Sequence, residues 1–266
     1  GFKSFRKLSF VKMSLNTAHA NNGVLIFAGE SIILYCDNVT LEFSGNSGTE
    51  FRGSKQGRIY LTTHRMIFNN KSTSDALKSF SFPFMTLSEV ELEQPLFGAN
   101  YIRGKVRAEP YGNWVGEAKF KLQFKSGGAI EYGQAMLQAA KLASRNAGPS
   151  WNVPPPPYSP PGNYHPADPS SYAPNPTGYY GWNPPLSTFP EHPPVNSVYM
   201  YDAPPPYPGI VPSGPPQASY ASSRDAKAAE AAQSAYYDPN YPGHAYVPQP
   251  AYYQPPPKYD DIKKME

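Results

Sequence analysis

Three short proline and tyrosine motifs are the residues of this sequence with the most specific chemistry. They are Pro155-Pro156-Pro157-Tyr158, Pro204-Pro205-Pro206-Tyr207 and Pro256-Pro257-Lys258-Tyr259. Consecutive prolines preset a polyproline II helix, so an aromatic-lined groove binds them without first ordering a flexible chain, and the tyrosine adds a flat apolar ring with a polar tip. The motifs therefore predict ligands of WW domains. The predicted contact residues are Pro155, Pro156, Tyr158, Pro204, Pro205, Tyr207, Pro256, Pro257 and Tyr259.

The two parts of the chain differ sharply in composition. Only three of the 33 prolines precede residue 147, whereas the last 120 residues hold the other thirty, together with 16 of the 21 tyrosines. Proline removes backbone donors, and aliphatic residues are sparse in this part, so little is present to build a core. Residues 147–266 are therefore predicted to be a disordered tail. Such a tail produces Pro/Tyr tetrapeptides by chance, but three spaced copies favour a function.

One alanine-rich stretch interrupts the predicted tail. Residues 223–237 are rich in good helix formers, and Ser222 and Asp225 match a Ser-x-x-Asp helix start. About fifteen residues is marginal for an isolated helix in water. We expect a short, fraying helix that a partner would complete.

Residues 13–146 have the pattern of a folded β domain. From Val24 to about Phe124 apolar residues recur with period two, which places alternate side chains on one face of a strand. In Lys119–Lys125 the apolar residues alternate with polar ones, as in a half-buried antiparallel strand. Breaks rich in Gly, Asn and Ser separate successive strands. The pattern predicts a small all-β barrel or sandwich.

The pattern changes to that of a helix after Gly127-Gly128. Residues 129–145 are rich in helix formers, and their apolar residues form one stripe. The stripe consists of Ile130, Gly133, Met136, Leu137, Ala140 and Ala143. We expect this helix to lie against the sheet and to close the barrel.

A hairpin at residues 57–68 is the second specific signal. Two strands, Ile59–Thr62 and Met66–Phe68, flank a polar turn at Thr63-His64-Arg65. The hairpin resembles the signature of GRAM domains, which are similar in fold to pleckstrin-homology domains. Further segments resemble the WW domain-binding protein 2 family in particular, and the resemblance covers essentially all of residues 13–146. These segments are Ser81–Phe84, Gln94–Lys105, Trp114, Gly127–Gln134 and, in the tail, Ala226–Pro239.

That resemblance implies a mainly β architecture: a GRAM domain at residues 13–146, built as a pleckstrin-homology-like barrel closed by one C-terminal helix and followed by the WW-binding tail at 147–266. It implies an adaptor and transcriptional coactivator in the cytoplasm and nucleus, and no enzyme. The implied partners are WW-domain proteins, including coactivators and ubiquitin ligases, together with nuclear hormone receptors and chromatin-associated complexes.

Pleckstrin-like folds often carry a phosphoinositide site, so basic residues of the domain are candidates for lipid contact. These residues are Arg52, Lys55, Arg58, Arg65, Lys119 and Lys121. An ordinary solvated sheet face is the alternative, because Glu89, Glu91 and Glu93 lie among them. The rival function is a peripheral membrane adaptor whose domain binds lipid head groups while the tail recruits WW-containing ubiquitin ligases.

Other chemistry finds little support in the sequence. Paired carboxylates, a nucleophile elbow, a Walker loop and zinc-ligand spacing are absent, so neither catalytic residues, a metal site nor a cofactor is predicted. Cys36 lacks a ligand-spaced partner and is expected to be a buried or idle thiol. His64 is expected at the surface, and contact with a ligand at the hairpin turn is the alternative. Residues 1–12, 13–146 and 147–266 carry net charges of +4, +3 and −4, too little for sequence-specific nucleic-acid binding.

The first twelve residues are expected to be a non-native or upstream leader, with Met13 as the true start. A basic arm that touches membranes is the alternative, because Lys3, Arg6, Lys7 and Lys12 lie in this segment. No apolar run approaches the roughly 18 to 20 residues that span a bilayer.

Overall fold

The computed structural model describes most of the N-terminal two thirds of the chain. The described residues are 14–21, 23–109, 112–146, 164–189, 193–194 and 196–210, together with the backbone of residues 236–237 and 245–246. The chain divides after Pro216 into two units, each of which is considered by itself. The predicted leader at 1–12 lies outside the described residues, as does the predicted helix at 223–237 except for its last two residues.

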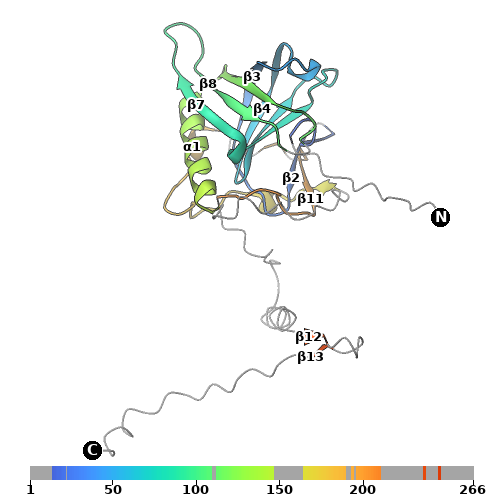
Figure 1. Cartoon of the computed structure of the whole chain (residues 1–266). Helices are drawn as coiled ribbons and strands as arrows, with labels where there is room; N and C mark the ends of the chain where they lie inside the picture. The colour runs from blue at the N-terminus through green and yellow to red at the C-terminus, as the bar shows by residue number, and fades with distance from the viewer. Residues whose placement is uncertain are drawn as a thin grey trace, which may run out of the picture. The chain divides into compact units, whose positions relative to one another are not determined.

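A seven-stranded antiparallel sheet forms the main layer of the first unit (Figure 1). Its order is β6-β5-β4-β3-β9-β8-β7, and short 3-10 turns at Thr49–Phe51 and Phe84–Thr86 connect some of the strands. The strands are β3 Ile32–Ser44, β4 Ser54–Thr62, β5 Arg65–Asn70, β6 Ser79–Pro83, β7 Leu87–Glu93, β8 Tyr101–Arg107 and β9 Glu117–Phe124. The predicted mainly β fold and the predicted hairpin at 57–68 are confirmed, because β4 and β5 pair across residues 57–70.

The long strand β3 pairs with two neighbouring strands, β4 and β9, and its pairing is irregular. Its pairing with β4 shifts register twice, and Asn38 at the second shift has a φ of 57°. Beyond the shift, Val39–Ser44 pair with β9. Such an irregularity increases the local twist of a sheet and lets it curve around a core. Phe120, Leu122 and Phe124 of β9 are all buried in that core, as their alternation predicted.

Helix α1, Ala129–Asn146, follows β9 and lies against β7, β8 and the Phe84–Thr86 turn (Figure 1). The predicted closing helix is therefore confirmed, but its buried face is rotated from the predicted stripe. Leu137 is exposed and Ile130 only half-buried, whereas Tyr132 and Leu142 are buried. Tyr132 is aimed inward because its ring packs on Phe124 at 5.2 Å between centroids.

A second, four-stranded sheet joins the N-terminal residues to part of the predicted tail. Its order is β1-β2-β11-β10, with β11 parallel to β2 and the other pairs antiparallel. The strands are β1 His19–Ala20, β2 Gly23–Phe27, β10 Tyr164–Pro166 and β11 Val198–Tyr201, and two short helical turns, α2 Pro169–Tyr172 and η3 Leu186–Thr188, lie between the last two. The prediction of disorder over 147–266 is therefore wrong for the described part of residues 164–210.

The reason for this difference is a second apolar cluster that the tail completes. Val24 and Ile26 of β2 are fully buried, and they pack with Tyr172, Val198 and Met200 from the tail. Residues 196–201 contain no proline, so their amides are free to pair with β2. The strand that pairs with β2 and buries its apolar side chains is thus β11, which lies within a proline-rich segment.

The second unit, from Gln217 onward, has two short described strands. They are β12 Tyr236–Tyr237 and β13 Ala245–Tyr246, which pair antiparallel. The two residues at the end of the predicted 223–237 helix therefore belong to a strand.

Candidate functional site

The turn of the predicted hairpin is a buried polar centre. Thr63, His64 and Arg65 are 3%, 7% and 1% exposed, so the expectation of a surface position for His64 is wrong. Burial lowers the pKa of the His64 imidazole to about 4, and its Nδ1 lies 2.8 Å from the hydroxyl of Thr63. At neutral pH this imidazole is uncharged.

Arg65 is held by hydrogen-bond acceptors from separate parts of the chain. Its Nε and Nη2 each donate to one carboxylate oxygen of Glu30 at 2.9 Å, and Nη1 donates to the hydroxyl of Ser81 at 2.9 Å. Glu30 also accepts from the Thr62 hydroxyl at 2.6 Å and from the Phe27 amide at 3.0 Å. A buried ion pair is sustained only when its remaining donors and acceptors are satisfied in this way.

The tyrosine of the second Pro/Tyr motif lies over this buried pair. The Arg65 guanidinium carbon is 4.7 Å from the Phe27 ring centroid and 5.8 Å from that of Tyr207. Phe27 and Tyr207 meet edge to face with centroids 6.4 Å apart. Phe84 of the Phe84–Thr86 turn and Ala143 of α1 line the same small void as Tyr207. Tyr207 is consequently 5% exposed.

Backbone hydrogen bonds fix the chain on both sides of Tyr207. Before it, the Ala28 amide donates to the carbonyls of Tyr201 and Ala203, both at 3.0 Å. After it, the Ile210 amide donates to the Thr63 carbonyl at 2.9 Å, and the Asn146 side chain donates to the Gly209 carbonyl at 3.0 Å. The Ile210 side chain is fully buried in the main core.

Of the predicted WW-contact residues, the structure describes those of the second motif. Pro204 is exposed and Pro205 half-buried, while Tyr207 is buried. Pro155, Pro156 and Tyr158 of the first motif, and Pro256, Pro257 and Tyr259 of the third, lie outside the described residues.

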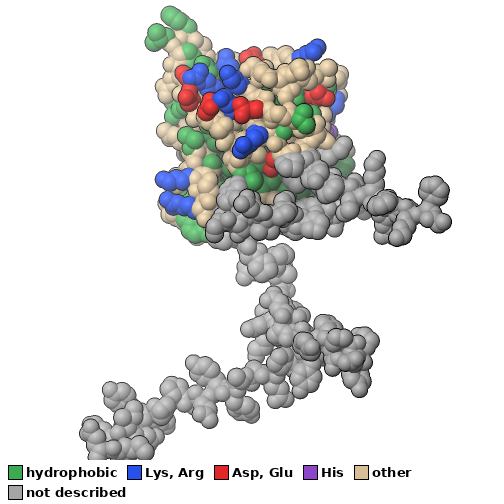
Figure 2. Space-filling model, viewed as in Figure 1, with side chains coloured by type: hydrophobic (Ala, Val, Ile, Leu, Met, Phe, Trp, Pro, Cys, Tyr) green, Lys and Arg blue, Asp and Glu red, His purple; other side chains and the backbone are tan. Residues whose placement is uncertain are grey.

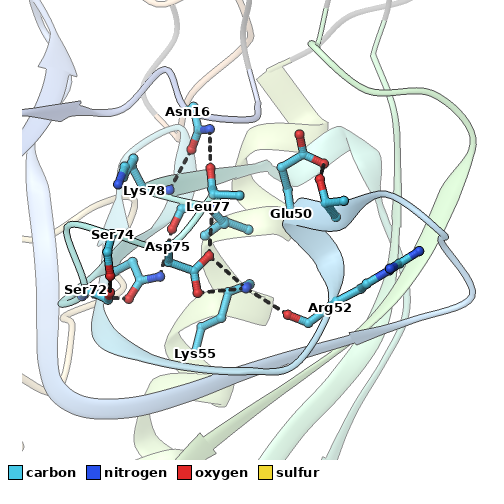
Figure 3. A network of polar contacts seen from close by, with 12 residues as sticks. Asn16, Glu50, Arg52, Lys55, Ser72, Ser74, Asp75, Leu77 and Lys78 are labelled. Atoms are coloured by element: carbon cyan, nitrogen blue, oxygen red, sulfur yellow. Dashed lines mark hydrogen bonds and ion pairs between the residues drawn. The ribbon is translucent and has the colours of Figure 1, made fainter.

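Two of the six basic lipid candidates are buried inside the domain. Arg65 is paired with Glu30, and Lys55 is 4% exposed. Figure 3 shows the Lys55 ammonium between the carboxylate of Asp75, at 2.9 and 3.1 Å, and the Arg52 carbonyl, at 2.9 Å. Their prediction as lipid contacts is therefore wrong, because both charges are already neutralised away from solvent. The Arg52 side chain, by contrast, extends away from this network (Figure 3).

Arg58 lies in an open groove of about 630 Å³ near the N-terminal end of the domain. Its guanidinium forms an ion pair with Asp37. His19, Lys71 and Lys78 line the same groove. The groove therefore brings together more basic than acidic groups.

Lys119 and Lys121 lie in a separate groove of about 500 Å³ over strands β3, β8 and β9. Acidic and basic groups alternate there: Lys105 pairs with Glu89 at 2.6 Å, and Arg103 pairs with Glu91 at 2.5 Å and with Glu93 at 2.9 Å. Figure 2 shows such Lys/Arg and Asp/Glu side chains next to one another on the viewed face. The six basic candidates thus do not converge on one site.

The described residues offer little for other chemistry. They contain no group of three or more His, Cys, Asp or Glu side chains that could hold a metal ion. Within the same ranges, none of the helices has the length and apolar character needed to cross a bilayer. Burial raises the pKa of the Cys36 thiol to about 11, so this thiol remains protonated at neutral pH.

Sequence reasoning missed Glu30 and the docked strand Val198–Tyr201. Val198 and Met200 alternate with Tyr199 and Tyr201, a period-two signal that was available in the sequence. For Glu30 no local signal exists, because its partner Arg65 lies on a distant strand.

The chain is similar to several known proteins. The family model described as GRAM domain matches residues 25–142. The chain is 42% identical to human "WW domain-binding protein 2" over 89% of this chain and 93% of that protein. It is 44% identical to the human "Postacrosomal sheath WW domain-binding protein" over 50% of this chain and 45% of that protein. The solved "Vps36 N-terminal PH domain" aligns at 16% identity and a TM-score of 0.35, over 50% of this chain and 92% of that one.

The antiparallel sheet and its closing helix occupy the region matched at residues 25–142, so the chain is a protein built on a GRAM domain. Because the chain is 42% identical to the human and rat proteins named "WW domain-binding protein 2" and covers 93% of each, it belongs to the WW domain-binding protein 2 family.

Proposed function

We propose that this protein is an adaptor and transcriptional coactivator that recruits WW-domain proteins through its three Pro-Pro-x-Tyr motifs. The observation that carries the proposal is the presence of these motifs, ending at Tyr158, Tyr207 and Tyr259, in a chain whose relatives are named for WW-domain binding. Each motif supplies a preformed proline segment and one aromatic anchor for a WW groove. The motifs lie C-terminal to the GRAM domain, and the protein acts in the cytoplasm and nucleus.

The partners in this proposal are WW-containing coactivators and ubiquitin ligases, with nuclear hormone receptors and chromatin complexes reached through them. A four-residue motif has limited selectivity, so several WW proteins would compete for the same sites.

The test replaces Tyr158, Tyr207 and Tyr259 together by alanine in the full chain. Calorimetry with single and tandem WW domains should show that binding is lost, and a reporter assay should show that coactivation is lost. The matched control is Tyr180→Ala, since Tyr180 is 61% exposed and outside any motif. Normal binding by the triple variant would refute the proposal. Lost binding with persistent reporter activity would separate WW recruitment from transcription.

The basic groove at Arg58 favours a second function, that of a peripheral membrane adaptor. Arg58, Lys71 and Lys78 surround it, with Asp37 as the opposing carboxylate. Anionic lipid head groups are attracted by such clusters, each cation contributing about 1 kcal/mol near a charged surface. Flotation of the full chain with vesicles that contain phosphoinositides tests this function. Lys71→Glu with Lys78→Glu should abolish flotation, while Lys119→Glu with Lys121→Glu in the other groove should not.

A further inference from the structure

The second Pro-Pro-x-Tyr motif has a conformation in which its tyrosine is not accessible to a WW domain. A WW groove takes the tyrosine ring of its ligand into a subpocket, so that ring must be accessible. Tyr207 is only 5% exposed, while Pro204 at the start of the same motif faces solvent. The same ring cannot fill a pocket in the GRAM domain and a pocket in a WW domain at once.

The seat of Tyr207 is built from parts of the GRAM domain that are distant in sequence. Phe27 from β2 and Arg65 from β5 lie against its ring, and Phe84 and Ala143 line the void beside it. Arg65 is charged and buried, and a cation near an aromatic face is worth more when it is desolvated. The seat is therefore mainly apolar, with the Arg65 guanidinium of the buried ion pair near the ring, which suits a tyrosine.

A close approach of two elements holds the chain just beyond the motif. Gly209 lies so near the His64 imidazole that a Cβ on residue 209 would be 2.3 Å from Nε2. The next residue, Ile210, is fully buried and donates its amide to Thr63 at 2.9 Å. Glycine at position 209 lets the chain lie against His64 while Ile210 stays buried and bonded to Thr63. A larger side chain at this position should therefore release the segment.

We propose that the GRAM domain contains a binding site for its own second Pro-Pro-x-Tyr motif, and that this site competes with WW domains for Tyr207. The proposal rests on the proposed function, because the competing ligand is a WW domain. A WW domain would bind this motif only in the fraction of molecules that have released residues 204–210, so the apparent affinity falls by that fraction. The two other motifs are separate ligands and serve as references.

The first experiment compares the motif in the full chain with the motif alone. Tyr158→Ala and Tyr259→Ala leave Tyr207 as the one intact motif of the chain, and a synthetic peptide of residues 200–214 provides the free motif. Calorimetry with a single WW domain should give an affinity for the chain at least about tenfold weaker than for the peptide. Adding Gly209→Val to the chain should raise its affinity and so remove most of that difference. The same change in the peptide should have no effect, since residue 209 is outside the four-residue motif.

Two further variants guard this comparison. Ile210→Asp should release the segment as Gly209→Val does, because docking would then bury an uncompensated charge. Asp202→Asn, at an exposed position of the same segment, should leave the affinity unchanged. Melting curves confirm that the domain remains folded. Equal affinities for chain and peptide would overturn the proposal, as would a chain affinity that Gly209→Val and Ile210→Asp both leave unchanged.

The second experiment measures docking without any WW domain. Hydrogen exchange should show the Ile210 amide protected in the unmodified full chain and unprotected after Gly209→Val, because that change removes its bond to Thr63. An unprotected Ile210 amide in the unmodified chain would overturn the proposal. A peptide that binds no WW domain would instead remove this motif from the proposed function and end the competition, whereas a protected Ile210 would still establish the docking site.

Discussion

Arg65 and Glu30 form a two-pronged ion pair that is closed off from solvent. Each of two guanidinium nitrogens lies 2.9 Å from a carboxylate oxygen, and the two side chains are 1% and 0% exposed. Burial by itself would raise the pKa of Glu30, but Arg65 beside it holds the pKa below its ordinary value. The pair therefore stays charged at neutral pH, and its guanidinium packs against the rings of Phe27 and Tyr207.

Breaking this pair on one side should destabilise the domain strongly. Glu30→Gln leaves the Arg65 charge buried without compensation, and losses of about 3–5 kcal/mol are typical of such changes. Arg65→Met alone should cost a similar amount. Glu30→Gln combined with Arg65→Met should cost much less than the sum, because no unpaired charge remains. Urea denaturation of the four proteins gives the coupling energy, and strictly additive losses would contradict the role assigned to the pair.

The stability of the domain should depend on pH through His64. Burial lowers the pKa of His64 to about 4 from an ordinary value of 6.5. Between pH 6.5 and 4 the unfolded chain therefore binds a proton at His64 that the folded chain does not bind. The free energy of unfolding keeps its full value above about pH 6.5 and decreases as the pH falls toward 4. At pH 5 the loss should be about 2 kcal/mol.

His64→Gln isolates this contribution, since other groups titrate equally in both proteins. The stability of the unmodified chain minus that of the variant, followed by denaturant unfolding from pH 7.5 to 5, should fall by that amount. A constant difference would mean that His64 is protonated as readily in the folded chain as in the unfolded chain.

Two glycines of the domain should respond in opposite ways to alanine. At Gly57 on β4, a Cβ would lie 2.0 Å from the Asn69 carbonyl oxygen and 2.7 Å from the Phe68 ring. Gly57→Ala should therefore cost about 1–3 kcal/mol through overpacking. At Gly133 on α1 the nearest atom would be 3.4 Å away, on Ile102. Gly133→Ala should be neutral or stabilise by about 0.5–1 kcal/mol, because alanine favours the helix. Thermal unfolding ranks the two variants, and the reverse order would contradict the packing described.

Tandem WW domains should distinguish the three motifs. When a partner holds one motif, its second contact becomes intramolecular with a raised effective concentration, so tandem domains should bind more tightly than single ones. If Tyr207 is docked, the contacts come chiefly from the motifs of Tyr158 and Tyr259. Tyr207→Ala should then weaken tandem binding least of the three single variants. Three equal losses in calorimetry would show that all motifs are equally accessible.

The parts of the fold that sequence predicted correctly depend on local patterns. The alternation in Lys119–Lys125 identified β9, and the hairpin signature identified β4 and β5. The helix at α1 was found from composition, but Leu137 was assigned to the wrong face, since a helical stripe drawn from small residues fits more than one rotation.

The parts that it did not predict depend on contacts between distant residues. Arginine is usually exposed, and Arg65 is buried because Glu30, in another turn, neutralises it. Proline content predicts a tail without a core over residues 147–266, yet Val198–Tyr201 pair with β2. No local window reveals that the exposed edge of β2 requires such a partner.

The parallel pairing of β2 with β11 also sets an order for folding during synthesis. Val24 and Ile26 emerge from the ribosome early, while Val198 and Met200, which cover them, are made only near the end of the first unit. At typical rates of about 5–20 residues per second, the apolar face of β2 waits on the order of ten seconds or more for its cover. A chain released at residue 146 would never receive it. Until its proline-rich segment is made, the nascent GRAM domain thus exposes apolar surface of the kind that promotes aggregation.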